Sequence, residues 1–230
     1  MSKIAIMGAM PEEIEPLLEK VENIKKVEYA NNSYYEATYK GKELVIAYSK
    51  IGKVFSSLTA STLIEKFGCT KLLFSGVAGA INPELKIGDL IIADKLCQHD
   101  LDITIFGHDH GYVPEGAVFV ESDETLREVA KEVATKSNLS LIEGTIATGD
   151  QFVASSQRKE FISKTFNADA LEMEGASVAV VCDALDVPFF ILRAISDTAN
   201  DDADMDFDEF MVGSAKISAN FILDMVESVE

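Results

Sequence analysis

The stretch DALEMEGASVAVVCDALDVPFFILRAIS, at positions 169–196, decides the fold because a strand, a helix and a second strand follow one another within it. Small and apolar residues over 175–185 predict a helix, and VPFFILRAIS at 187–196 predicts a strand that is apolar on both faces. Strands of this kind are typical of a parallel or mixed sheet that helices cover. The stretch therefore indicates the α/β class.

The same alternation continues through the rest of the chain. Strands are predicted at 3–8, 71–76, 88–94 and 141–148, and two more within 33–49, joined at Gly41-Lys42. The residues VAGA at 77–80 are expected to leave the strand 71–76 as a loop. Helices are predicted at 53–66, 122–137, 155–165 and 207–228, with Ser122 as the expected cap of the second.

A further helix is expected directly after the first strand. Pro11 suits its first turn, and apolar residues recur at helical spacing as far as Val21 and Ile24. No linker, repeat or low-complexity segment interrupts the pattern. We therefore expect one domain over residues 1–230, with a central twisted mixed β-sheet flanked by helices.

The composition excludes several classes of partner. The 230 residues are 47% hydrophobic, and 39 acids against 20 bases give a formal net charge of −19. This charge repels phosphate backbones and anionic lipid surfaces, so we expect neither nucleic acid nor a membrane as a partner. No apolar run could span a bilayer, the N-terminus lacks a signal-peptide pattern, and the three separated cysteines suggest reduced thiols, so a cytoplasmic location is expected.

Two acids, Glu172 and Glu174, lie inside the otherwise small or apolar run at 169–180. Burying a carboxylate without a partner is unfavourable in free energy, so we expect both acids to have a hydrogen-bond partner or a ligand. Ligands of α/β sheets bind beyond the carboxyl ends of strands, and glycines and acids gather at those predicted ends. They are Gly8, Glu12, Glu13, Gly76, Gly79, Gly149, Asp150, Glu172, Glu174 and Asp197, and Ser196 precedes the last of these acids.

These residue types suit a sugar joined to a flat base. The carboxylates of Glu172 and Glu174 share a face if the segment is extended, and a carboxylate can accept bonds from two adjacent ribose hydroxyls. Asp197 could protonate a ring nitrogen, and Phe152 could stack on a heterocycle. The lack of a side chain at Gly79 permits close backbone approach to a ligand.

Six segments, in this order, carry a family resemblance: GAMPEEIEPL at 8–17, SKIGKV at 49–54, SGVAGA at 75–80, GDQFV at 149–153, LEMEGASVAVVC at 171–182 and RAISDTAND at 193–201. Together they resemble the bacterial 5′-methylthioadenosine/S-adenosylhomocysteine nucleosidase family, within the purine nucleoside phosphorylase superfamily. The likeness covers Lys3 to about Val226. It implies a nucleoside phosphorylase-like fold and a homodimer that splits the N-glycosidic bond of adenine nucleosides with water, without a metal or organic cofactor.

The resemblance also implies substrates. They are 5′-methylthioadenosine, S-adenosylhomocysteine, 5′-deoxyadenosine and 6-amino-6-deoxyfutalosine, which connect such enzymes to methionine salvage, the activated methyl cycle and menaquinone synthesis. The combination of SKIGKV, SGVAGA and GDQFV resembles the subgroup that cleaves aminodeoxyfutalosine. Preference among these nucleosides stays open at the level of sequence.

The resemblance assigns the chemistry to a few residues. Asp197 would protonate adenine N7, with Ser196 orienting it, and Glu13 would hold and activate the attacking water, with Arg193 as a nearby charge partner. Protonation makes adenine a better leaving group, and burial would help Asp197 to hold the proton. Nearby carboxylates would stabilise positive charge on the sugar.

The remaining assignments concern binding. Glu174 would bind the ribose hydroxyls, whereas Glu172 either binds substrate or supports neighbouring backbone. The other residues implied are Met173 against the sugar; Phe152, Val153, Ala78 and Gly79 around adenine; Ile51 and Phe207 in an apolar 5′ pocket; and Ile103, Phe106 and Pro114 of the partner subunit in the same pocket.

The chain departs from familiar members at three positions. Val77 stands where some carry serine, Pro11 replaces an acid, and Gln151 stands where others have alanine. Because Pro11 leaves two candidate acids, Glu12 and Glu13, the water is assigned to Glu13, which lies three residues after Met10.

Three alternatives remain. A phosphorylase would use phosphate in place of water, but acids at the start of the first helix would repel it. A metal hydrolase could use His99, Asp100, Asp102, His108, Asp109 and His110, although their spacing matches no metal motif. A calcium-binding protein could use Asp202, Asp204, Asp206 and Asp208, although Phe207 and Gly213 depart from the EF-hand pattern.

Overall fold

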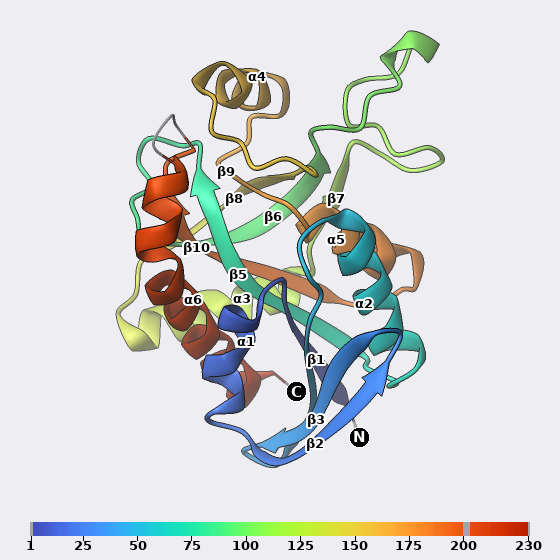
Figure 1. The fold of residues 1–230 in the computed structure, drawn as a ribbon, viewed down its shortest axis with the longest axis vertical. Helices are drawn as coiled ribbons and strands as arrows, with labels where there is room; N and C mark the ends of the chain where they lie inside the picture. Colours follow the sequence, from blue (N-terminus) through green and yellow to red (C-terminus); the bar gives the residue numbers. More distant parts are fainter. Residues whose placement is uncertain (1, 200–202, 230) are drawn as a thin grey trace.

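A computed structural model describes residues 2–199 and 203–229 and contains one sheet of 10 strands with helices packed against it (Figure 1). The strands are β1 (Lys3–Gly8), β2 (Glu22–Tyr29), β3 (Asn32–Tyr39), β4 (Lys42–Tyr48), β5 (Lys71–Ala80), β6 (Leu90–Gln98), β7 (Phe119–Glu121), β8 (Leu141–Thr148), β9 (Ala170–Glu172) and β10 (Phe189–Asp197). The helices are α1 (Pro11–Leu18), α2 (Lys53–Glu65), α3 (Glu124–Ser137), α4 (Ser156–Phe166), α5 (Gly175–Ala184), α6 (Ala203–Ser228) and the short η1 (Thr104–Phe106).

The strand order is β10-β6-β8-β9-β5-β1-β4-β3-β2, with β7 paired to β6. Because β10 also pairs with β5, the strands β5, β9, β8, β6 and β10 close into a ring, from which β1, β4, β3 and β2 extend. Parallel and antiparallel pairs both occur, which confirms the expected mixed sheet. The parallel strands β1, β5 and β10 bring their carboxyl ends together.

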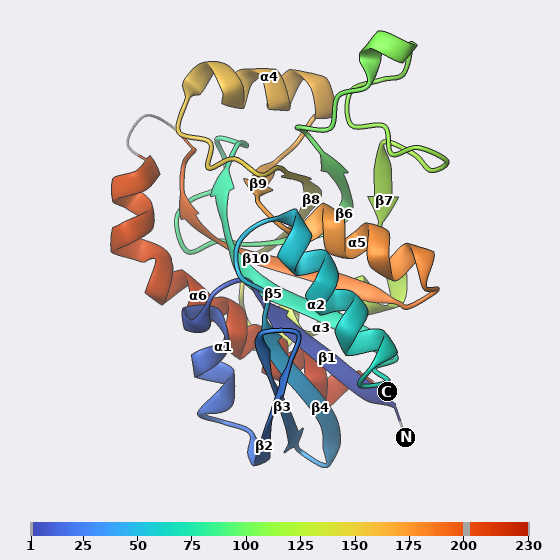
Figure 2. The same cartoon turned by 45° about the vertical axis from the view of Figure 1, so that its right-hand side comes forward.

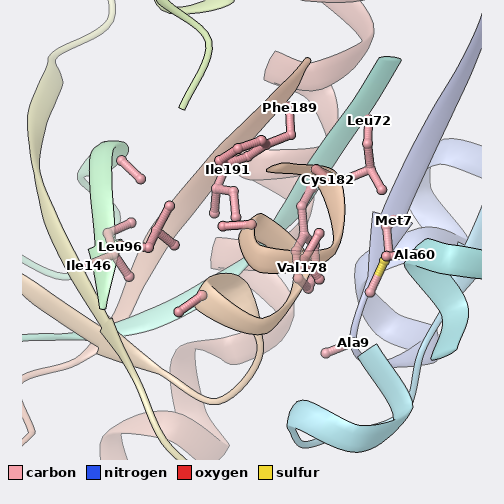
Figure 3. Close-up of a cluster of buried hydrophobic side chains, with 14 of the residues drawn as sticks. Met7, Ala9, Ala60, Leu72, Leu96, Ile146, Val178, Cys182, Phe189 and Ile191 are labelled. Atoms are coloured by element: carbon pink, nitrogen blue, oxygen red, sulfur yellow. The ribbon is translucent and has the colours of Figure 1, made fainter. Parts of the chain in front are cut away.

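Helices cover both faces of the sheet (Figure 2). On one face α2 and α5 pack over β1, β5, β6 and β10 around buried residues such as Leu72, Val178 and Ile191 (Figure 3). On the other face α1, α3 and α6 surround a second cluster that includes Ile6, Leu17 and Phe221. Helix α4 lies over the ring and buries Ile162 and Phe166. The strand ends are therefore held by apolar packing on each side.

The first helix is shorter than expected. It ends at Leu18, and Glu22–Tyr29 forms strand β2, so the prediction of a helix through Val21 and Ile24 is wrong. Asn23 has a left-handed φ of 57°, which a helix does not accept. Ala30 and Asn31 then turn the chain into β3 with φ values of 49° and 56°, a hairpin turn that lacks the usual glycine signal.

Two further expectations are corrected. VAGA is not a loop, because β5 continues to Ala80 and pairs with β10 and β9. Ser122 is not the cap of α3: the side chain of Asp123 accepts from the Leu126 N–H at 2.8 Å, while the Ser122 hydroxyl donates to the Ala93 carbonyl. Strand β7 and helix η1 were not anticipated.

The outermost strand, β2, is polar and largely exposed along its length. Lys25 pairs with Glu36 on β3, and Lys26 pairs with Glu28. Across the described ranges, no helix is long and apolar enough to cross a membrane. The thiols of Cys69, Cys97 and Cys182 are buried and unbridged, and burial raises the pKa of each to about 12.

Candidate active site

One cavity of about 430 Å³ lies where the carboxyl ends of the strands meet. That volume falls within the range of small-molecule sites. Its lining comes from segments far apart in the sequence. The lining residues are Ala9, Met10, Glu13, Ile51, Val77, Ala78, Gly79, Gln151, Phe152, Val153, Leu171, Glu172, Met173, Glu174, Ser196, Asp197 and Phe207.

Glu13 occupies the first turn of α1 and points back to the end of β1. One carboxylate oxygen accepts from the N–H groups of Ala9 at 2.5 Å and Met10 at 3.1 Å, and the other accepts from the Val77 N–H at 3.1 Å. Burial raises the pKa of Glu13, while the charge of Arg193 and these three N–H groups oppose the rise. Glu13 is thus fixed in direction, and a raised pKa makes its carboxylate a better proton acceptor.

Arg193 makes its direct ion pair with Glu172, at 2.6 Å, and both side chains are buried. Its guanidinium also lies 4.0 Å from the centre of the Phe74 ring. Arg193 was expected as a charge partner of Glu13. Its positive charge lowers the pKa of Glu13, but its side chain does not line the cavity.

Both oxygens of Glu172 serve the local structure. They accept from the N–H groups of Glu174 and Gly175, from the Thr148 hydroxyl and from Arg193. These bonds satisfy the start of α5, because the first N–H groups of a helix lack internal partners. The geometry favours a supporting role for Glu172 over direct substrate binding, although its side chain reaches the cavity wall.

Glu174 stands immediately before α5, beyond the end of β9, and not in an extended strand. One of its oxygens accepts from the Gly52 N–H at 2.8 Å. Burial, and then the nearby charge of Glu172, raise the pKa of Glu174 to about 8. Its neighbour Met173 also lines the cavity.

Asp197 ends β10 at an irregularity in the pairing with β5. The Ser196 hydroxyl donates to one oxygen of Asp197 at 3.0 Å, and the Ala199 N–H donates to the other at 2.9 Å. A Cβ on Gly79 would lie 2.6 Å from the second oxygen, so glycine is required beside this acid. The Ser196 hydroxyl and the Ala199 N–H together fix the direction of the Asp197 carboxyl group.

Apolar side chains form the outer part of the cavity. The rings of Phe152 and Phe207 meet edge to face with their centres 5.6 Å apart, and Phe152 remains 48% exposed. Ile51 is also half exposed, whereas Val153 is buried. These residues were predicted to surround the base and the 5′ substituent, and the fold brings all of them into the lining of the cavity.

Sequence reasoning did not assign Ala9, Met10 or Leu171 to the site, and it treated Val77 and Gln151 only as departures. Ala9 and Met10 lie between the first strand and the Pro11-Glu12-Glu13 start of the first helix, a position that could have included them. Leu171 directly precedes the candidate acid Glu172, and it pairs with Gly79 of the neighbouring strand β5.

Ile103, Phe106 and Pro114 lie outside this cavity. They belong to the segment between β6 and β7, which projects from the body of the molecule (Figures 1 and 2, green). The Phe106 side chain is 77% exposed. These three residues therefore do not line the cavity of their own chain.

The surroundings of the other candidate ligands are different. His99 is buried with Nδ1 3.1 Å from Arg158, and burial lowers its pKa to about 4. Among the residues that the structure describes, no three His, Cys, Asp or Glu side chains are grouped to hold a metal ion. Asp202 and the side chains of Asp204, Asp206 and Asp208 lie outside the described part.

A mixed sheet whose strand ends gather carboxylates around one cavity defines an enzyme that acts on a small molecule, and this chain belongs to the phosphorylase superfamily, whose family model matches residues 3–227. More particularly, the chain is similar to nucleosidases. It is 61% identical to the aminodeoxyfutalosine nucleosidase of Campylobacter jejuni, with 100% of both chains covered.

Two solved structures agree. The crystal structure of the Campylobacter jejuni 5′-methylthioadenosine/S-adenosylhomocysteine nucleosidase is 61% identical, with a TM-score of 0.95 and 100% of both chains covered. The native structure of the futalosine hydrolase of Helicobacter pylori is 49% identical, with a TM-score of 0.97, covering 99% of this chain and 98% of the other. The nucleosidase resemblance is confirmed, and a hydrolase is favoured over a phosphorylase.

Proposed function

We propose that this protein hydrolyses the N-glycosidic bond of adenine nucleosides and releases adenine. The observation that carries the proposal is the acidic lining of the cavity by Glu13, Glu172, Glu174 and Asp197, with neither lysine nor arginine among the described lining residues. The described lining offers phosphate no cationic side chain, and its ionised carboxylates stabilise positive charge on a ribose ring as the bond breaks. Water is therefore the expected nucleophile.

The roles follow the geometry of each carboxylate. Asp197 delivers a proton to adenine N7 and is oriented by Ser196. Glu13, held by backbone N–H groups, accepts a proton from the water that attacks C1′. Glu174 accepts hydrogen bonds from the ribose hydroxyls, and Glu172 holds the Glu174 backbone by accepting a hydrogen bond from its N–H group. General acid and base steps of this kind each contribute about 10²–10⁴-fold in typical enzymes.

We propose aminodeoxyfutalosine and 5′-methylthioadenosine as substrates, with S-adenosylhomocysteine as a third. Support comes from the Campylobacter jejuni relatives, which are 61% identical and carry names for both activities. The apolar outer wall of Ile51, Phe152 and Phe207 suits an uncharged thioether on the 5′ carbon.

The direct test is adenine release from each nucleoside by purified protein. We expect turnover in phosphate-free buffer, unchanged by added phosphate and by a chelator, with free ribose derivatives as products. A requirement for phosphate, or a sugar 1-phosphate among the products, would refute the hydrolase proposal and leave a phosphorylase.

We also propose that a second copy of the chain completes the site. An apolar strip of Ile51, Val54, Phe55 and Leu58 runs along the start of α2 and remains exposed, with Val54 77% exposed. It lies next to the cavity, and the projecting segment with Ile105 and Phe106 offers a second exposed apolar surface. Burying such surfaces against each other would stabilise a dimer.

Sedimentation at micromolar concentration tests this arrangement. The wild-type protein is expected as a dimer, and Val54→Lys is expected to shift it toward monomer and to lower activity. A fully active monomer in either protein would contradict the proposal.

A further inference from the structure

The segment 49–53 beside the cavity has a strained backbone. Lys50 has a φ of 78° and Gly52 a φ of 100°, on either side of Ile51. A residue other than glycine takes such a conformation only when its surroundings enforce it. The Ser49 and Lys50 N–H groups donate to the Gly8 and Ala9 carbonyls at 2.8 and 2.9 Å, which ties one side of the segment to the end of β1.

The other side of the segment is tied by charge. The Lys53 ammonium lies 2.7 Å from the Asp100 carboxylate and 3.2 Å from the Gln98 amide oxygen. The Lys53 N–H donates to Asp150 at 2.8 Å, and the Asp150 N–H donates to Asp100 at 2.9 Å. Three elements, the start of α2, the end of β6 and the loop after β8, are thus joined in a closed cycle of contacts.

This cluster is sheltered from solvent. The side chains of Lys53 and Asp100 are only 18% and 16% exposed, so their attraction is screened less than that of a surface pair. Burial raises the pKa of Asp100, but the bonds from Lys53 and the Asp150 N–H outweigh it and hold the pKa below the ordinary value. The Asp100 carboxylate is therefore ionised at neutral pH.

Between the two ties, the Gly52 N–H donates to Glu174 across 122 residues of sequence. We propose that Lys53, through its ion pair with Asp100, is a positioning residue that holds this N–H on Glu174 and so orients the acid toward the ribose. The inference rests on the proposed nucleosidase function. Lys53 does not line the cavity, and its effect is transmitted through the strained segment.

Lys53 should affect the contacts with ribose but not the binding of the adenine base. Without the ion pair, the segment is free to relax and the Gly52 N–H leaves Glu174. Adenine itself carries no ribose, so its binding should not depend on Lys53. Asp100→Asn keeps an oxygen that can accept from the Asp150 N–H, so the loop that carries Phe152 keeps its support.

A second signature is the pH profile. Glu174 faces the charges of Glu172, Arg193 and Glu13, and the Gly52 N–H lowers its pKa. Loss of that N–H raises the pKa of Glu174 further. The acidic limb of kcat/KM should therefore move to higher pH in a Lys53 variant, because a larger share of Glu174 holds a proton at any given pH.

The experiment compares Lys53→Met, Asp100→Asn and the double variant with the wild-type enzyme. We expect each single change to lower kcat/KM by about 10- to 100-fold, as small displacements of catalytic groups do. The double variant should be no worse than the more damaged single variant, because both remove one interaction. Lys53→Arg should recover part of the activity, and inhibition by adenine should stay within about twofold of wild type, far below one tenfold step in affinity.

Lys131→Met is the matched control. Lys131 also contacts two carboxylates, those of Glu128 and Glu143 at 2.8 Å each, but it lies on α3, away from the cavity. Thermal unfolding of every variant reports stability separately, and Lys53→Gln replaces Lys53→Met if the latter does not fold.

Failure of the nucleosidase function and failure of the positioning role of Lys53 give different results. If the wild-type protein releases adenine from no nucleoside, the proposed function fails and this inference fails with it. If the wild type is active, the inference alone is overturned by any of three results: Lys53 variants as active as the control, adenine inhibition weakened in parallel with turnover, or an unmoved acidic limb.

Discussion

At the scale of single residues, two glutamates separated by one methionine have different environments. Glu172 accepts from Arg193 and from two N–H groups, whereas Glu174 accepts from the Gly52 N–H and meets the charge of Glu172. The Glu172 carboxylate is surrounded by donors, whereas the Glu174 carboxyl lies beside another acid, which favours its protonated form. The first acid therefore stabilises the protein, and the second is available to a ligand.

Removing Glu172 tests that division. Glu172→Ala leaves Arg193 buried without its ion partner, which typically costs about 3–5 kcal/mol. Urea unfolding should show a loss of that size. A loss no larger than that of Glu128→Ala, which removes a surface ion pair, would show that Glu172 has no supporting role.

Asp197→Asn and Glu13→Gln test the assigned chemistry. Each keeps the size of the side chain but removes a proton donor or acceptor, so turnover should fall by about 10²-fold or more. Both proteins should keep the wild-type circular dichroism spectrum and bind a non-hydrolysable nucleoside. Activity near that of wild type in either variant would remove that residue from its role.

Glu174 should also make stability depend on pH. Its pKa is about 8 in the folded protein against an ordinary 4.5. Between these values the unfolded chain has released the proton and the folded protein retains it, so stability falls as pH rises. Wild-type protein should therefore lose more stability between pH 5 and 8 than Glu174→Gln, by on the order of 1 kcal/mol or more. Equal losses by urea unfolding would contradict the raised pKa.

At the scale of elements, the close approach of β5 to α1 and β10 depends on a glycine. A Cβ on Gly76 would lie 2.8 Å from the Glu13 carboxylate and 3.0 Å from the Arg193 guanidinium. The Glu13 carboxyl group and the Arg193 guanidinium therefore occupy the space that a side chain at position 76 of β5 would fill.

Gly76→Ala should displace Glu13 and lower kcat by about 10²-fold, in line with the effect of small displacements on catalysis. The control is Gly116→Ala, where the nearest atom is 3.4 Å from the added carbon. Steady-state kinetics of both variants check the prediction, and an active Gly76→Ala enzyme would count against the placement of Glu13.

The alternation of strands and helices could be predicted from sequence because each element has its own apolar pattern. Strand β2 could not, since Ile24 and Val21 happen to continue the helical spacing and the turn at Ala30-Asn31 lacks glycine. The acids at strand ends were visible, but their convergence depends on the parallel order of β1, β5 and β10. The Gly52–Glu174 bond joins distant segments and has no local signal.

At the scale of the whole molecule, the closed ring takes strands from both halves of the chain. β5 pairs with β1 on one side and with β10 on the other, and α6 packs against β5, β10 and α1. The two halves therefore contribute side chains to the same buried clusters. We therefore propose that residues 1–230 form one cooperative domain.

Calorimetry checks this proposal. We expect one transition, with equal calorimetric and van't Hoff enthalpies once dissociation of any dimer is included. Two transitions that can be separated by pH or by a bound nucleoside would show independent folding units.

The polar strand β2 has a consequence for concentrated solutions. It is an edge strand of the sheet. The unpaired backbone N–H and C=O groups of an edge strand can form hydrogen bonds with a strand of another molecule. If two β2 strands paired in this way, their lysines and glutamates would bring like charges together. Natural proteins use charged edge strands to prevent such pairing. The protein should therefore resist fibril growth, and apolar replacement of Lys25 and Lys26 should increase thioflavin-positive aggregation.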